Sequence, residues 1–186
     1  MNNNEIYLLC SVVSALAALA GLIFVGLEHH QSNKVKRAEF LDDLINRMRG
    51  DSDIRGILYV FQYNGFVYNI DFHEDTESQR KVDKALLYLS YICYLRSRRI
   101  IKKREFAFFE IEISQTLRNR GVIDYLFNLY HFECRVAGLD PDSREGRKQF
   151  TFYYLLEYGR LLGLVEDGFF DPNNAGTGFY HKYLNF

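Results

Sequence analysis

The chain has 186 residues, nearly half of them hydrophobic, and a formal net charge of -1 at pH 7. That length allows one domain with a substantial core beside a membrane span, but it excludes two such domains. The near-neutral charge excludes a strong bulk attraction to nucleic acid, so we expect no DNA partner, and any anionic ligand must meet a local basic patch. Two prolines against 16 phenylalanines and 14 tyrosines indicate long elements with aromatic packing.

The first element in the chain is the uncharged stretch Ile6–Leu27. At about 1.5 Å per helical residue, it is long enough to cross a bilayer core of roughly 30 Å. It is longer than the apolar part of a secretory signal, and the basic residues Lys34, Lys36 and Arg37 follow it instead of preceding it. The positive-inside rule therefore predicts an N-terminus outside the cell and a C-terminal part in the cytoplasm.

These features predict three parts of the chain and a place for it. Residues 1–28 are expected to be a transmembrane anchor, residues 29–37 a juxtamembrane linker and residues 38–186 a cytosolic helical domain. The expected localisation is a membrane, with the C-terminal part in the cytoplasm, and the lipid bilayer is the first expected partner.

Small residues occupy one face of the predicted span. Ser14, Ala17, Ala18 and Gly21 recur at helical spacing. Small residues let helix backbones approach closely in lipid, so this face is a candidate for helix association and for a homo-oligomer. The alternative is that single-pass helices are simply rich in alanine and glycine.

The remainder of the chain predicts an all-α fold, a bundle of about five to six helices after the single N-terminal span. Apolar residues recur at helical spacing in five well-marked segments. Gly50 and Gly121 are expected as breaks at helix ends, and Asp51 or Ser52 is expected as the N-cap of the helix after Gly50. The expected helices are 38–49, 77–97, 105–119, 122–136 and 149–166, with a loop over 138–148 and an aromatic tail, Phe179, Tyr180, Tyr183 and Phe186, docked on the body.

The segment Ile54–Asn69 is ambiguous. Its β-branched and aromatic residues also suit a pair of strands that turn at Asn64-Gly65, a dipeptide typical of hairpins. We favour a helix through about Tyr63 followed by a turn or a short extended piece, with the hairpin as the alternative.

No catalytic signature is present in the sequence. There is no glycine-rich phosphate loop, no nucleophile elbow and no paired Cys or His at metal-ligand spacing, so we predict no enzyme, no cofactor and no metal site. His73, His131 and His181 are far apart, and His131 in NLYHF is expected to be a hydrogen-bonded core side chain. The three cysteines are odd in number and far apart, which fits a reducing cytoplasm.

A basic cluster between two predicted helices is the sharpest candidate site. Its six cations fall within nine positions, and Arg118 and Arg120 are expected to join them from a neighbouring helix end. Arginine binds phosphate bidentately, and Tyr91 or Tyr94 is a candidate to stack on a base, so the pattern indicates an anion or nucleotide site. The alternative is a solvated turn that favours anionic lipids. The cluster consists of Arg96, Arg98, Arg99, Lys102, Lys103 and Arg104.

Three blocks of the sequence resemble a family of short bacterial proteins that carry a domain of unknown function. The blocks are DKALLYLSYICYLRSRRIIKKREFAFF at Asp83–Phe109, DYLFNLYHF at Asp124–Phe132 and YLLEYG at Tyr154–Gly159. The resemblance implies an all-helical cytosolic domain in a bacterium, often behind an N-terminal hydrophobic segment, so the expected membrane is the bacterial inner membrane. It carries over no site residue. In layout the chain is also similar to bacterial antiviral membrane effectors, whose cytosolic domain binds a cyclic oligonucleotide.

Two hypotheses for function follow. In the first, a membrane-anchored helical module self-associates and conveys a cytosolic signal to the membrane, in the setting of antiviral defence that the layout implies. In the second, the signal is a cyclic oligonucleotide that binds the basic cluster of an oligomer and leads it to disrupt the membrane. A hydrolase hidden in the helical domain is a distant third.

Overall fold

The computed structural model describes residues 3–73 and 75–171, apart from the side chains of 3–18, 20, 23, 27, 70 and 167. Within that part the fold is all-α with no strand, which confirms the predicted fold class. The helices are α1 (Asn3–Gly50), α2 (Ser52–Gln62), α3 (Thr76–Ser97), α4 (Lys103–Arg118), α5 (Arg120–Ala137), α6 (Arg144–Gln149) and α7 (Tyr153–Leu161), with short 3-10 turns η1 (Ile70–His73) and η2 (Asp167–Phe170).

The chain divides into two compact units, Met1–Ile45 and Asn46–Phe186. The boundary lies inside α1, which is a single helix of 48 residues, so the predicted linker 29–37 is helical. The sequence from Glu28 to Arg49 contains neither proline nor glycine, the two residues that most disfavour a helix interior. A continuous helix is therefore the expected conformation of this segment.

In the part of the chain that the structure describes, no helix is both long enough and apolar enough to cross a membrane. The side chains of Ser14, Ala17 and Ala18, predicted for helix association, lie outside the described residues. Gly21 is described and exposed, and a Cβ atom there would meet nothing within 4 Å. The predicted anchor and its association face stay predictions.

Helix α2 is a helix and not the first strand of a hairpin, so the favoured prediction is confirmed. Asp51 caps its start, since its carboxylate accepts hydrogen bonds from the backbone N–H groups of Asp53 and Ile54. At its end Asn64 adopts a φ of 51°, and the N–H of Gly65 donates to the Val60 carbonyl at 2.8 Å. Together these form a Schellman motif, so the Asn-Gly dipeptide ends a helix here instead of turning a hairpin.

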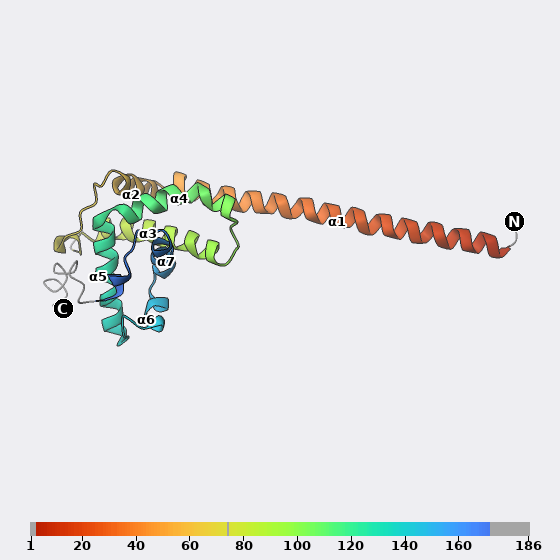
Figure 1. The fold of residues 1–186 in the computed structure, drawn as a ribbon. Coiled ribbons are helices and arrows are strands. Elements are labelled where there is room, and N and C mark those ends of the chain that lie inside the picture. The colour runs from red at the N-terminus through yellow and green to blue at the C-terminus, as the bar shows by residue number, and fades with distance from the viewer. Residues whose placement is uncertain (1–2, 74, 172–186) are drawn as a thin grey trace. The chain divides into compact units, whose positions relative to one another are not determined.

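Helix α3 is the centre of the second unit, where it packs against α2, α4 and α7 (Figure 1). The predicted stripe of apolar residues on this helix is buried along its whole length. Burying that many side chains from one helix is the main contribution that the helix makes to stability, at roughly 2 kcal/mol for each large apolar side chain. The buried residues are Val82, Ala85, Leu86, Tyr88, Leu89, Ile92, Cys93 and Leu95.

The C-terminal part differs from the prediction. Residues 149–166 do not form one helix: α7 covers only Tyr153–Leu161, and the expected loop contains the short helix α6. Ser143 caps α6 by accepting from the Gly146 N–H at 2.9 Å, and Gly163 ends the α7 region with a φ of 67°. The aromatic tail predicted to dock, Phe179 to Phe186, lies outside the described residues.

The break between α4 and α5 also differs from the prediction. Asn119, not Gly121, separates the two helices, and it caps α5 by accepting from the Val122 N–H at 3.1 Å. Gly121 lies in the first turn of α5, where a Cβ atom would come within 2.5 Å of the Phe66 carbonyl oxygen. The glycine is therefore needed for a close approach of two backbones and not for a helix end.

His131 lies in the core, as the sequence predicts, and it gives the fold a pH dependence. Its Nε2 is 3.2 Å from the carbonyl oxygen of Phe169. Burial lowers the pKa of its imidazole below the usual 6.5, although the hydrogen bond to Phe169 and the charges of Asp171 and Asp142 act in the opposite direction. Because the folded pKa is the lower one, His131 stabilises the fold fully above about pH 6.5, and this contribution is lost as the pH falls through the folded pKa.

At pH values below about 6.5, we expect the urea midpoint of wild type to fall by more than the urea midpoint of His131→Phe, which lacks the titrating group. Urea unfolding between about pH 8 and pH 5 measures this difference. His29→Gln is the control, because His29 is exposed. The urea midpoint of this variant should change with pH as that of wild type does. Parallel pH curves for wild type and His131→Phe would contradict the prediction.

Candidate anion-binding site

The predicted basic cluster lies around the turn between α3 and α4. Arg96 is in the last turn of α3, Arg98 and Arg99 follow it, and Lys103 and Arg104 begin α4 after Lys102. The turn is tight, with Arg99 in the left-handed region at a φ of 59°. Arg96 is half-buried, and the other five cations are exposed.

These cations have no ion-pair partner in the described part of the chain, in contrast to arginines elsewhere. Arg120 pairs with Asp124 at 2.8 Å and Arg160 with Glu157 at 3.0 Å, whereas Arg98 and Lys148 have no such carboxylate. Lys103 and Arg104 also lie at the N-terminal end of α4, where the helix dipole is positive. Among the described residues, no carboxylate therefore neutralises the positive charge at this turn.

A hollow of about 410 Å³ opens beside the turn, with Arg98 in its wall. Its lining comes from three elements: Ser97 and Arg98 at the end of α3, Lys148 near the end of α6, and Tyr153 and Tyr154 at the start of α7. The hollow thus offers two cations, two phenols and one hydroxyl, a set that suits the oxygens of a phosphate group.

An aromatic cluster supports this hollow. The Arg98 guanidinium carbon lies 5.6 Å from the centre of the Tyr94 ring, which stacks on Tyr91 and meets Tyr154 edge to face at 5.0 Å. Tyr94 is thus held by its neighbours, while Tyr91 keeps 43% of its surface exposed. Of the two tyrosines predicted to stack on a base, Tyr91 is the more accessible.

Arg118 and Arg120 do not join the cluster. Arg118 is the last residue of α4 and Lys103 is the first, so about 22 Å of helix separates them at 1.5 Å per residue. Arg120 is paired with Asp124, as described above. The part of the predicted site that rested on these two arginines is wrong, because a helix over 105–119 already places them at its far end from the basic turn.

The sequence interpretation missed Lys148, Tyr153 and Tyr154. The sequence predicts Lys148 in the loop 138–148 and both tyrosines in the helix 149–166. No spacing or motif connects these residues to Arg98, about fifty positions earlier. Only the packing of α7 against α3 brings these residues to the end of α3.

A second polar cluster lies inside an aromatic cage and has a different character. The Tyr125 hydroxyl donates to the Asp83 carboxylate at 2.6 Å, and the Tyr68 hydroxyl lies 2.7 Å from Nε2 of His73 and accepts from the Asn128 amide. Burial raises the pKa of Asp83, although the hydrogen bond from Tyr125 acts against it. These bonds tie η1, α3 and α5 together, and the carboxylate and imidazole are not paired as in a catalytic dyad.

Among the described residues, no group of three or more His, Cys, Asp or Glu side chains is placed to hold a metal ion. Comparison of the chain with protein-family models, with curated proteins and with solved structures gives no match in any of the three. The resemblance to a family of short bacterial proteins and the layout shared with antiviral effectors therefore stay predictions.

Proposed function

We propose that this protein is a membrane-anchored helical module whose second unit binds a phosphate-bearing ligand at the α3–α4 turn. The observation that carries the proposal is that Arg98 and Lys148, two cations without ion-pair partners in the described chain, line one hollow with Tyr153 and Tyr154. A cyclic oligonucleotide is the ligand class that the second of the two hypotheses from the sequence names.

The physical support is an uncompensated positive charge in a concave, partly aromatic setting. A charge-assisted hydrogen bond contributes about 1.5–3 kcal/mol, so two such bonds contribute about 3–6 kcal/mol, and a base that stacks on a neighbouring tyrosine adds about 1–3 kcal/mol. Cations beyond the hollow, Arg99, Lys102, Lys103 and Arg104, add longer-range attraction for a ligand with several phosphates.

The anchor and the association of the anchor helices belong to the same proposal. The run Ile6–Leu27 contains no charged residue, and its small-residue face suits close packing against a second copy. A ligand changes such an assembly only if it binds one arrangement more tightly than another, so self-association and ligand affinity must be coupled reciprocally. Binding and oligomer formation are expected to strengthen each other.

Calorimetry on the purified full-length protein in detergent tests the ligand site, with cyclic oligoadenylates and their linear forms as probes. We expect Arg98→Glu or Lys148→Glu to weaken binding by on the order of 100-fold, because each change removes a cation and adds a repelling carboxylate. Arg118→Glu is the matched control, since it makes the same charge change at an exposed residue at the far end of α4.

No heat with wild type under any of these probes would contradict the proposal. An equal loss of affinity in Arg118→Glu would also contradict it, because net charge and not the hollow would then determine binding. Circular dichroism of each variant shows whether its helices are intact before the affinities are compared.

A further inference from the structure

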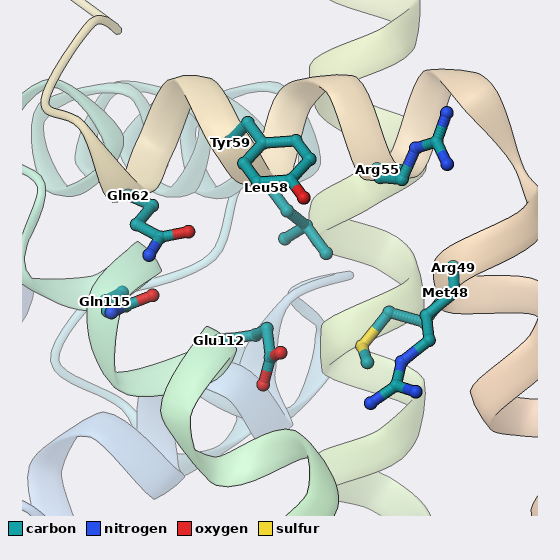
Figure 2. A pocket seen from close by; sticks show the side chains of 8 residues that line it. All are labelled: Met48, Arg49, Arg55, Leu58, Tyr59, Gln62, Glu112 and Gln115. Atoms are coloured by element: carbon teal, nitrogen blue, oxygen red, sulfur yellow. The ribbon is translucent and has the colours of Figure 1, made fainter.

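A second polar groove lies in the Asn46–Phe186 unit, lined by the last turn of α1 and by α2 and α4 (Figure 2). Its volume is about 350 Å³, and it is open to solvent along one side. It shares no residue with the hollow at Arg98. The lining residues are Met48, Arg49, Arg55, Leu58, Tyr59, Gln62, Glu112 and Gln115.

Helical spacing explains why these side chains share one groove. Arg55, Tyr59 and Gln62 are four and three residues apart on α2, so they lie on one face of that helix. Glu112 and Gln115 are three residues apart on α4, which packs against α2. The polar face of α2 therefore lies opposite the polar face of α4 across the opening.

The side chains that line the groove change in chemical character from one end to the other (Figure 2). Arg49 and Arg55 lie at one end, near the junction of α1 and α2, and Gln62 and Gln115 lie at the other end. Tyr59 from α2 and Glu112 from α4 lie between them. The sequence of groups is thus two cations, then a carboxylate and a phenol ring, then two amides.

Within the described residues, the charged groups that line this groove form no ion pair with their neighbours. The two nearest acidic residues in the chain, Asp51 and Asp53, both pair with Lys84, at 2.8 and 2.9 Å. In the described part of the chain Arg49, Arg55 and Glu112 form no ion pair at all, and Glu112 is half-buried on α4. A pocket that keeps opposite charges apart suits a ligand that carries complementary groups at matching positions.

The groups match a nucleotide read from its phosphate to its base. A guanidinium group binds a phosphate, a carboxylate accepts hydrogen bonds from both hydroxyls of a ribose, and a phenol ring stacks on a base. A glutamine amide donates and accepts at once, as the hydrogen-bonding edge of a base requires. We propose that this groove binds a ribonucleoside 5′-monophosphate, with phosphate at Arg49, ribose at Glu112 and base at Tyr59, Gln62 and Gln115. The guanidinium of Arg55 points away from that of Arg49 in Figure 2, so Arg55 attracts the phosphate from farther away.

The ribose contact gives the most specific test. Full-length protein in detergent is titrated by calorimetry with the four ribonucleoside 5′-monophosphates, their 2′,3′-dideoxy forms and inorganic phosphate. We expect at least one ribonucleotide to bind, and its dideoxy form to bind about 10-fold or more weakly, because Glu112 then has no hydroxyl to accept from. In Glu112→Gln this preference for ribose should shrink several-fold.

Arg49→Ala is expected to weaken binding of the ribonucleotide about 10-fold, because it removes a charge-assisted contact to phosphate, and Arg55→Ala is expected to weaken it by less. Arg118→Ala is the control, because Arg118 is exposed, lies on α4 three residues after Gln115, and does not line the groove. The same titrations are made in the Arg98→Glu background, which removes heat from the hollow and so distinguishes failure here from failure at the hollow. Thermal unfolding confirms that each variant is folded.

Three results would overturn the inference. Wild type that binds none of the four ribonucleotides would exclude a nucleotide site. Inorganic phosphate that binds as tightly as every ribonucleotide would mean that the groove holds an anion without reading ribose or base. A ribose preference that survives Glu112→Gln unchanged would place the ribose contact elsewhere.

Discussion

Replacing Gly121 with alanine is expected to destabilise the Asn46–Phe186 unit by roughly 3 kcal/mol. An alanine Cβ would come within 2.5 Å of the Phe66 carbonyl oxygen and 3.0 Å of the Tyr68 backbone nitrogen. Both neighbours are backbone atoms, so the conflict is not relieved by a side-chain rotation. The segment after α2 must move away from α5, and the aromatic contacts of Phe66 and Tyr68 with Tyr125 move with it.

Urea unfolding of full-length Gly121→Ala and wild type, followed by circular dichroism, measures the change. Gly56→Ala is the matched control, because Gly56 lies inside α2 and a Cβ there would meet nothing within 4 Å. Alanine favours a helix interior over glycine, so Gly56→Ala should stabilise the protein by up to about 1 kcal/mol. Equal effects of the two changes would show that the close approach to Phe66 does not exist.

Asn119→Ala is expected to cost about 2 kcal/mol in the free energy of unfolding. Asn119 is 1% exposed, and its side chain makes two hydrogen bonds at once. Its oxygen accepts from the Val122 N–H at 3.1 Å, and its amide donates to the Phe61 carbonyl at 3.3 Å. The alanine leaves a buried N–H without a partner and removes a contact between the end of α2 and the start of α5.

The comparison for Asn119 is the exposed cap Asp75, which accepts from the Ser78 N–H at 3.1 Å. Water replaces an exposed cap in part, so Asp75→Ala should cost only about 1 kcal/mol or less. Differential scanning calorimetry of both variants measures the two losses. A loss in Asp75→Ala equal to or larger than that in Asn119→Ala would contradict the role of the buried cap.

Local sequence predicted the helices of the second unit where apolar spacing and caps agreed. Val82, Leu86, Leu89 and Cys93 form a stripe with a helical period, and all four are buried in α3. Asp51 follows Gly50 as a cap follows a break, and the structure has both. These features depend on residues within a few positions of each other, so one stretch of sequence contains all the information.

The Asn64-Gly65 dipeptide shows where local sequence is not enough. A hairpin and a helix end both use asparagine with a positive φ, so the dipeptide fits either structure. The structure adopts the helix end because Ile54 and Phe61, seven residues apart on one face of α2, are both buried in the unit. A strand would place these two residues on opposite faces.

The candidate sites divide in the same way. The sequence predicted that the residues from Arg96 to Arg104 form an exposed basic turn, since six cations in nine positions cannot be buried together. It did not predict Lys148, Tyr153 or Tyr154 beside Arg98, and it gave no signal for the groove at Glu112. Each of these sites is made by helices that are distant along the chain.

The sequence by itself determined the uncharged N-terminal run, the all-helical class, most helix starts and the exposed basic turn. These follow from composition and from spacings of three or four residues. The tertiary structure alone decided that Gly121 serves a close approach of two backbones and which side chains line the hollow and the groove. The physical reason is that such contacts join residues tens of positions apart, and only the packing of α2, α4 and α7 around α3 sets their distances.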